Sequence, residues 1–266
     1  MSTKIEIDQT GAEAAYDLLS AEYDQFTAHH DYDGWLDSLL PPLEARGLEG
    51  DRLLDLGCGT GKSSLPMVER GWKVTACDFS RGMLQRLQAK SKGRITIHRA
   101  DIRRLPKFGE FDLILSLGDV LNYCAVGAPL EQSLAGIRKN LAPRGLALFD
   151  LNTLTTYRTF YAEQQVLETE DRRVEWRGQG DGSAEPGVLA ESVLEISTST
   201  TTATSVHRQA HLSEEEVRAA IEAAGLECLD VFGQGFDGVL QQPLREDTHT
   251  KAIYITKVRN HEEKRR

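Results

Sequence analysis

The sequence is short of the features that mark several large classes of protein. It has only four cysteines in 266 residues, Cys58, Cys77, Cys124 and Cys228, and they lack the paired spacing of a metal site. No apolar run approaches the roughly eighteen residues of a membrane span, and the first residues contain no apolar core of a signal peptide. We therefore expect reduced thiols, no bound metal, no membrane contact and a cytoplasmic location.

Positive charge is also scarce. Lysine and arginine number 31 against 41 acidic residues, which gives a formal net charge of −10. A partner such as DNA or RNA requires a basic surface, so this balance argues against nucleic-acid binding. The length suffices for one large domain with its own core. We expect a small-molecule substrate and a monomer or homodimer.

The most informative stretch is a glycine-rich turn. The apolar run Leu53–Leu56 leads into Gly57-x-Gly59-x-Gly61, and a helical pattern begins near Lys62. This order predicts a buried strand that turns sharply into a helix. Glycines let the backbone approach a ligand that a Cβ would block. An unpaired carboxylate at the strand end would be costly, so Asp55 is expected to serve a ligand or the N–H groups of the loop.

Two well-known phosphate-binding loops do not fit this turn. A dinucleotide site requires Gly-x-Gly-x-x-Gly, and Lys62 stands at the third glycine position. A phosphate loop ending in Gly-Lys-Ser requires a glycine where Leu56 stands. An NAD-dependent oxidoreductase therefore remains only as a disfavoured alternative.

The segment Asp55-Leu-Gly-Cys-Gly-Thr-Gly61 resembles the first motif of the class I methyltransferases that use S-adenosylmethionine. The resemblance covers most of the chain, from the first helix to the last strand. Within that superfamily the sequence is most similar to small-molecule enzymes such as amino-sugar N,N-dimethyltransferases and the glycine N-methyltransferase type. It implies S-adenosylmethionine as cofactor and S-adenosylhomocysteine as product, with Asp55, Gly57, Cys58 and Gly59 at the cofactor. Cys58 is read as a small residue that fills the tight turn.

Strands and helices alternate from residue 52 to 150, which predicts a parallel sheet with right-handed crossovers. We predict an α/β fold: a Rossmann-like, seven-stranded, mostly parallel sheet with helices on both faces, plus an antiparallel β insertion after strand five. The expected strands cover 53–56, 72–77, 95–97, 111–116, 146–150, 226–232 and 251–258. Two capping boxes, at Thr10 and Ser213, are expected to begin helices. Pro41 and Pro42 are expected to bend or break the helix over 35–46.

We expect one methyltransferase domain over residues 1–266, with five parts. These are an N-terminal helical cap (10–48), a cofactor-binding core (50–156), a β insertion or lid (157–212), C-terminal core elements (213–258) and a charged tail (259–266). No helical period is visible in the insertion, and its Ser/Thr-rich run at 197–205 is expected at a hairpin tip. We expect the insertion to lie over the active site and to govern substrate choice.

Further cofactor contacts follow from position. Asp78 ends the second strand 21 residues after Gly57, close to the roughly 20-residue spacing of a ribose-binding carboxylate. Phe79 and Met83 are then placed against the adenine or ribose. The resemblance implies that Asp101 accepts from the adenine amine and that the backbone of Ile102 meets the ring. The remaining expected contacts are Tyr23, Tyr32 and Leu117. Arg103 and Arg104 are interpreted as surface charges.

The segment Leu117–Tyr123 follows the fourth strand and is the second place where chemistry is expected. The family motif there contacts the methionine part and the incoming nucleophile, which makes Asp119, Asn122 and Tyr123 candidate catalytic residues; helix capping is their alternative role. His207 and His211 share one face of a strand in the insertion, and that face points either at the substrate or at water. They are candidate bases, with His29 and His30 in reserve.

Methyl transfer from a sulfonium needs mainly proximity, alignment and exclusion of water. A base matters for a hydroxyl acceptor and less for an amine that loses its proton to solvent. We therefore predict methylation of an amine of a secondary metabolite or amino sugar. Methylation of a hydroxyl with a histidine base is the alternative, and a non-catalytic protein that binds S-adenosylmethionine is the alternative from another class.

Overall fold

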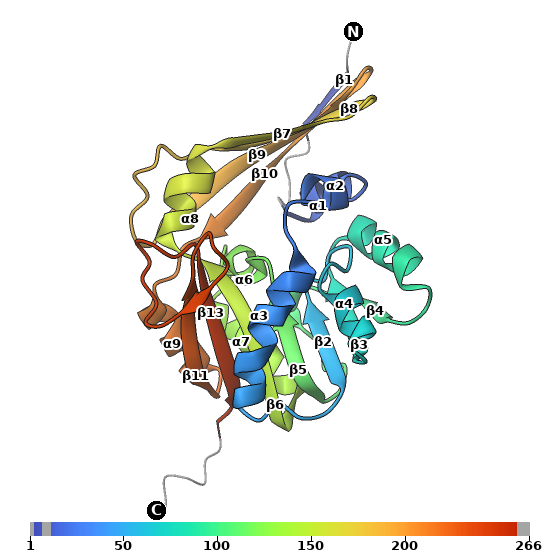
Figure 1. Ribbon diagram of the computed structural model, residues 1–266. Coiled ribbons are helices and arrows are strands. Elements are labelled where there is room, and N and C mark those ends of the chain that lie inside the picture. The colour runs from blue at the N-terminus through green and yellow to red at the C-terminus, as the bar shows by residue number, and fades with distance from the viewer. Residues whose placement is uncertain (1–2, 7–11, 260–266) are drawn as a thin grey trace, which may run out of the picture.

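Two β-sheets make up the framework of the chain, as the computed structural model shows for residues 3–6 and 12–259 (Figure 1). The larger sheet has eight strands in the order β12–β11–β13–β6–β5–β2–β3–β4. Their bounds are Arg52–Leu56 (β2), Lys73–Asp78 (β3), Thr96–Arg99 (β4), Phe111–Ser116 (β5), Leu141–Asn152 (β6), Leu226–Gln234 (β11), Leu240–Gln241 (β12) and Lys251–Val258 (β13). Strands β2 to β6 pair in parallel, whereas β13, β11 and β12 add to one side in antiparallel register.

The order of the strands fixes where a ligand can bind. The chain enters the middle of the sheet at β2, builds outward through β3 and β4, and then crosses back to β5 on the other side of β2. The loops after β2 and β5 therefore diverge and leave a crevice at the carboxyl ends of these strands. In open α/β sheets this switch point is where ligands bind.

Helices cover both faces of the larger sheet (Figure 1). On one face α3, α4 and α5 bury apolar side chains that include Leu39, Met67 and Leu87. On the other face α7 and α9 bury a second set that includes Ile137 and Ile221. The helices are Tyr32–Ala45 (α3), Ser64–Glu69 (α4), Arg81–Ser91 (α5), the 3-10 turn Ile102–Arg104 (η1), Val120–Cys124 (α6), Leu130–Asn140 (α7) and Glu214–Ala223 (α9). Within the described residues no helix is both long and apolar enough to cross a membrane.

The smaller sheet stands beyond the carboxyl ends of the parallel strands (Figure 1). Its five strands have the order β1–β10–β9–β8–β7 and span Thr3–Glu6 (β1), Gln164–Glu168 (β7), Arg172–Gly178 (β8), Leu189–Thr198 (β9) and Thr201–Ala210 (β10). Two short helices, Ala12–Leu19 (α1) and Tyr23–Phe26 (α2), pack against it through an apolar cluster around Leu19, Val174 and Leu194. We call α1, α2 and the residues up to 30 the N-terminal cap.

The predicted fold class is confirmed, and most strands lie close to their predicted positions. The sheet has one strand more than expected because the two-residue β12 pairs with the end of β11. Gly145 lies inside β6, where the register opposite β5 jumps between Leu141 and Leu146. The predicted capping box at Ser213 is present, since its hydroxyl accepts from the backbone N–H of Glu216. The capping box expected at Thr10 lies outside the described residues.

Two local expectations were wrong. The segment expected to lack helix contains α8 (Leu154–Thr159) and the 3-10 turn η2 (Phe160–Ala162), where Tyr157 and Tyr161 are buried against the small sheet. Helix α3 continues through Pro41 and Pro42 to Ala45, because three of its leucines are anchored in the core. As expected, the Ser/Thr-rich run lies at a hairpin tip: it includes the end of β9, the turn at 199–200 and the first half of β10.

Candidate functional site

A pocket of about 370 Å³ opens at the switch point of the larger sheet. Its walls come from the glycine loop, the ends of β3, β4 and β5, the N-terminal cap and strand β10. Of the residues predicted to form the site, those that line the pocket are Tyr23, Tyr32, Gly57, Cys58, Gly59, Asp78, Phe79, Met83, Asp101, Ile102, Leu117 and Tyr123. The structure does not place Asp55, Asp119, Asn122, His207 or His211 in the lining.

The glycine loop is held against the end of β3. Gly57 and Cys58 donate their backbone N–H groups to the carbonyl of Cys77, at 2.8 and 3.1 Å. Gly57 has a φ of 68°, and a Cβ there would lie 2.5 Å from the Cγ2 atom of Val120. Glycine is therefore required both for the turn and for its close approach to α6.

Asp55 lies beneath the loop and acts on the start of α4. Its Oδ2 atom accepts hydrogen bonds from the hydroxyls of Ser63 and Ser64, and its Oδ1 atom has no hydrogen-bond partner among the described residues. Burial raises the pKa of Asp55 to about 6, although the two hydroxyls work against that shift. The side chain thus fixes the loop-to-helix junction without reaching the pocket wall.

Asp78 is the buried carboxylate that does face the pocket. Its Oδ2 atom accepts from the N–H of Gly59 at 2.9 Å, and its Oδ1 atom accepts from the N–H of Ser80 at 2.8 Å. Burial raises the pKa of Asp78 to about 6, while these N–H groups pull the pKa down. The cap of α5 is Ser80, whose hydroxyl accepts from the backbone N–H of Met83 at 3.1 Å. Asp78 is therefore left free for a ligand.

Asp101 is paired with Arg103, which also lines the pocket. The guanidinium contacts both carboxylate oxygens, at 2.8 to 3.1 Å, and the backbone N–H of Arg103 donates to Oδ1. Burial alone would raise the pKa of Asp101, but Arg103 lowers it below its usual value. The interpretation of Arg103 as a plain surface charge was wrong. Its two-residue separation from Asp101 was the available signal.

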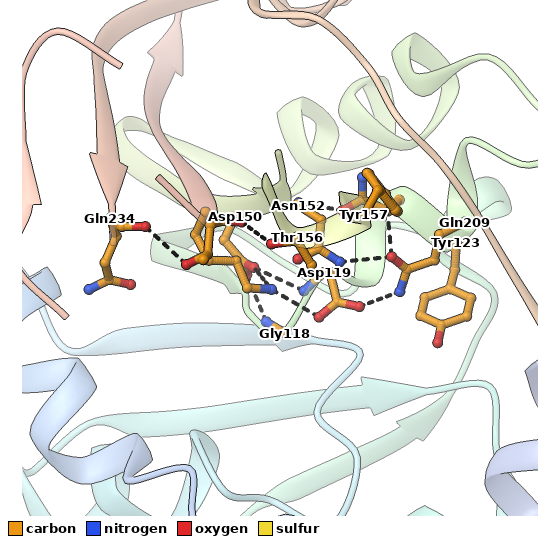
Figure 2. A network of polar contacts seen from close by, with 12 residues as sticks. Gly118, Asp119, Tyr123, Asp150, Asn152, Thr156, Tyr157, Gln209 and Gln234 are labelled. Atoms are coloured by element: carbon orange, nitrogen blue, oxygen red, sulfur yellow. Dashed lines mark hydrogen bonds and ion pairs between the residues drawn. The ribbon is translucent and has the colours of Figure 1, made fainter. Parts of the chain in front are cut away.

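A polar network beneath the pocket shapes the loop after β5 (Figure 2). Asp150, at the end of β6, accepts from the backbone N–H of Gly118 at 2.7 Å and from that of Asp119 at 3.0 Å. Both donors have left-handed backbones, with φ of 85° and 56°. Lys251, at the start of β13, contacts Asp150 at 2.8 Å and Asp119 at 3.0 Å. Burial would lower the pKa of Lys251, but the two carboxylates outweigh burial and hold the pKa above its usual range.

The same network joins the small sheet to the core. Gln209 of β10 donates a hydrogen bond to Asp119 (Figure 2). It also accepts one from the side-chain amide of Asn152 at 2.8 Å. Asn122 is fully buried, donates to the carbonyl of Ala210 at 3.0 Å and accepts from the N–H of Asn152 at 2.9 Å. Asp119 and Asn122 thus bind structural partners, and neither caps α6 through its side chain.

His207 of β10 and His211, which follows the end of that strand, are both buried. His207 contacts the hydroxyl of Tyr123 at 3.1 Å, and burial lowers the pKa of His207 to about 4. His211 contacts Glu246 at 2.7 Å and the backbone N–H of Gly187 at 3.1 Å. The period-two pattern correctly placed them on one face, but it could not tell that this face is buried. His29 and His30 are exposed and lie outside the pocket lining.

Polar contacts fasten the N-terminal cap over the pocket. Asp17 accepts from the hydroxyl of Ser80 at 2.6 Å and from the N–H of Gly82 at 2.8 Å. Asp24 accepts from Lys90 at 2.7 Å and from Thr60. Lys62 reaches Thr27 and lies 5.2 Å from the ring centre of Tyr32. Lys62, at the end of the glycine loop, thus helps to hold the cap against the loop.

Sequence reasoning missed several residues of this region. The unforeseen members of the pocket lining include Tyr16, Lys62, Val206 and Arg208. Lys251 and Asp150 were missed because the antiparallel register of β13 on β6 brings them together, and no local sequence pattern encodes that register. Tyr16 was visible as an aromatic residue in the first helix, but nothing in the sequence indicated its partner.

The Lys251 cluster generates a stability prediction. Lys251→Met leaves the carboxylates of Asp119 and Asp150 without their shared cation, and Asp150 is fully buried. We expect the free energy of unfolding to fall by about 3 kcal/mol, as for a buried pair that loses one partner. The measurement is urea unfolding at pH 7.

A matched control lies on the same strand. Lys257 pairs with Glu227 at 3.4 Å, and both side chains are more than a third exposed. Lys257→Met should therefore cost less than about 1 kcal/mol. Equal losses of unfolding free energy in the two variants would show that the buried cluster stabilises the fold no more than an exposed ion pair does.

Comparison with known proteins agrees with this architecture. Residues 53–145 match a family model described as "Methyltransferase domain". A putative methyltransferase of Bacillus subtilis (strain 168) is 33% identical over 141 residues, which cover 52% of this chain and 56% of that protein. The cypemycin N-terminal methyltransferase of a Streptomyces species is 29% identical over 238 residues, or 88% of this chain and 91% of the relative. The chain spans between a half and two thirds of the length of the first curated relatives that it matches.

A solved structure extends the likeness to the fold. The sugar N-methyltransferase KedS8 from Streptoalloteichus sp ATCC 53650 superposes with a TM-score of 0.70 at 22% identity, over 98% of each chain. The agreement includes the small sheet as well as the parallel core, since nearly the whole chain is covered. Residues 53–145 thus match a methyltransferase domain, and the fold of nearly the whole chain is similar to that of a solved sugar N-methyltransferase.

Proposed function

We propose that the chain transfers the methyl group of S-adenosylmethionine to an amine nitrogen of a small molecule. The observation that carries the choice of an amine is the chemistry of the pocket wall. Among the described residues, no histidine lines the pocket, and the pKa values of Tyr16, Tyr23, Tyr32 and Tyr123 are all raised by burial. A hydroxyl acceptor would need a base near the methyl group, whereas an amine can lose its proton to solvent.

The residues fit the cofactor in a consistent order around the pocket. Asp78 has one backbone donor on each oxygen, so each oxygen keeps a lone pair for a ribose hydroxyl. Phe79 and Met83 flank that position, and Gly57, Cys58 and Gly59 supply a wall that a side chain would fill. S-adenosylmethionine supplies an activated methyl group when it is bound, and these residues hold and orient it.

The adenine end is assigned to the segment after β4. Arg103 occupies both oxygens of Asp101, which leaves about one of the roughly four lone-pair sites for an exocyclic amine. The backbone of Ile102 completes that contact. At the other end, Leu117 and Gly118 face the region between Tyr32 and Tyr123, where the methyl group and its acceptor would meet. Tyr23 of the cap and Tyr32 at the start of α3 exclude water from this region.

The nature of the acceptor draws on the relative that matches most of the chain. It is named as an N-terminal methyltransferase, and it aligns over 88% of this chain. Amino groups of peptides and of amino sugars are thus the first acceptors to test. The small sheet stands over the acceptor end of the pocket, with Val206 and Arg208 of β10 in the wall, and is proposed to select the substrate.

The function is tested by methyl transfer from a labelled donor to three acceptors: an amino sugar, a short peptide with a free N-terminus, and a phenol. We expect label on one or both amines and none on the phenol. Label on the phenol alone would favour the hydroxyl alternative. A protein that binds S-adenosylhomocysteine but transfers nothing to a wide metabolite extract would instead be a non-catalytic binder.

Cofactor affinity should depend on Asp78. The Asp78→Ala variant loses two hydrogen bonds to the ribose, each worth roughly 1.5–3 kcal/mol when the acceptor is charged. We expect S-adenosylhomocysteine to bind at least about 100-fold more weakly in calorimetry. Asp78→Asn keeps the size of the side chain and one acceptor oxygen, so its loss should be smaller. Near-native affinity of the folded Asp78→Ala variant would refute the assignment.

The same carboxylate predicts a pH dependence of binding. The ribose hydroxyls need ionised Asp78 as acceptor, and the pKa of Asp78 in the free protein is about 6. Lowering the pH from 7 to 5 should therefore weaken S-adenosylhomocysteine binding by about tenfold, because a proton must leave before the ligand is held. In Asp78→Asn this dependence should disappear. A pH dependence that survives in Asp78→Asn would have to come from another group, such as Asp55.

A further inference from the structure

Three rings from distant parts of the chain meet beside the acceptor end of the pocket. Tyr16 comes from α1, Tyr123 from α6 and His207 from β10. The hydroxyl of Tyr16 donates to that of Tyr123 at 3.2 Å, and the hydroxyl of Tyr123 lies 3.1 Å from Nδ1 of His207. The ring centres are 5.3 to 5.9 Å apart, and each pair packs edge to face. This packing holds the three polar atoms in one chain.

Burial increases along this series of hydrogen-bonded side chains, from Tyr16 through Tyr123 to His207. Tyr16 and Tyr123 line the pocket and are half-buried. His207 is 3% exposed and is not part of the lining. Its Nε2 atom is buried without a hydrogen-bond partner among the described residues. A buried polar atom without a partner costs stability. We infer that His207 is kept despite this cost because its Nδ1 atom contacts Tyr123.

The contacts also fix the direction of the hydrogen bonds. Tyr16 donates its only proton to Tyr123, so Tyr123 has its own proton available for Nδ1 of His207. His207 must then be neutral and carry its proton on Nε2. Burial keeps the ring neutral by lowering the pKa of His207 to about 4, and burial also raises the pKa of both tyrosines. The hydroxyl oxygen of Tyr16, at the pocket end of this hydrogen-bonded series, therefore keeps its lone pairs free.

We propose that Tyr16 accepts a hydrogen bond from the N–H of the methyl acceptor, and that Tyr123 and His207 are positioning residues that keep the Tyr16 proton turned away from it. This rests on the proposed function, and it deepens it by defining an acceptor nitrogen that carries at least one hydrogen. The nitrogen lone pair is left to form the N–C bond. The S–C bond breaks with its electrons passing to sulfur, and the product nitrogen keeps its proton and leaves as an ammonium.

The three hydrogen-bonded side chains orient the acceptor nitrogen and do not remove its proton. An alkylammonium product has a pKa near that of lysine, about 10.4, whereas the pKa of His207 is about 4. Moving the proton to His207 would be unfavourable by about 10⁶-fold, the difference of roughly six pH units. The ammonium product keeps its proton while it is bound and exchanges it with the buffer after release, so His207 has no role as a base for an amine.

The first experiment examines the hydrogen bonds of Tyr16, Tyr123 and His207 in the absence of a methyl acceptor. Nitrogen-15 NMR of histidine-labelled protein saturated with S-adenosylhomocysteine reports which ring nitrogen of His207 carries the proton; His207→Asn identifies the signal. We expect the proton on Nε2 at pH 6 to 8, and we expect Tyr123→Phe to shift the Nδ1 signal. A proton on Nδ1, or a signal that ignores Tyr123→Phe, overturns the proposal.

The second experiment measures steady-state kinetics with the amine that the labelled-donor assay identifies. Tyr16→Phe should lower kcat/KM by about five- to tenfold, the size of one net hydrogen bond, mainly through a higher KM for the acceptor. His207→Leu should act in the same direction. His207→Asn places its side-chain oxygen near the position of Nδ1 and should restore kcat/KM to within about twofold of the wild type.

Tyr161→Phe is the matched control, since it removes the hydroxyl of a buried tyrosine outside the pocket lining. It should leave kcat/KM within about twofold of the wild type. An unchanged kcat/KM in Tyr16→Phe, or equal losses in His207→Leu and His207→Asn, overturns the proposal. Wild-type protein that binds no S-adenosylhomocysteine would instead contradict the proposed function, so the two failures are distinguishable.

Discussion

The site depends on one interaction, the contact of the Asp150 carboxylate with two successive backbone N–H groups after β5. These N–H groups belong to Gly118 and Asp119, which both have left-handed backbones. A fully buried carboxylate is tolerated there because Lys251 places a cation 2.8 Å away. Since Lys251 and Asp119 also pair, and Asp119 accepts from Gln209, the same interaction fixes the loop after β5 and anchors β10 above it.

Around this anchor the site divides into a rigid floor and an attached roof. The floor is the parallel sheet, whose strand ends carry the glycine loop and Asp78. The roof is the N-terminal cap with the small sheet, joined to the floor by Asp17, Asp24 and Lys62. The contacts of the cap with the floor are polar and only partly buried, whereas β10 of the small sheet is joined to the floor by buried polar pairs. This division suits an enzyme that must admit a large cofactor and then exclude water.

Local patterns in the sequence were enough for the floor but not for the roof. The glycine loop, the ends of β2 and β3 and the capping box at Ser213 are short-range features, and the sequence placed them correctly. The contacts of Lys251 with Asp150 and of Tyr16 with Tyr123 join residues about a hundred positions apart, and they follow from strand register and packing. His207 was placed on the correct face of its strand, but the direction of that face depends on how the small sheet sits on the core.

The central claim is that the pocket at the switch point binds S-adenosylmethionine and not a nicotinamide dinucleotide. Calorimetry of the wild-type protein with S-adenosylhomocysteine and with NAD tests it directly. The account predicts one binding site for S-adenosylhomocysteine and no measurable heat with NAD, because Lys62 stands where a dinucleotide loop needs its third glycine. Binding of NAD with no binding of S-adenosylhomocysteine would contradict it.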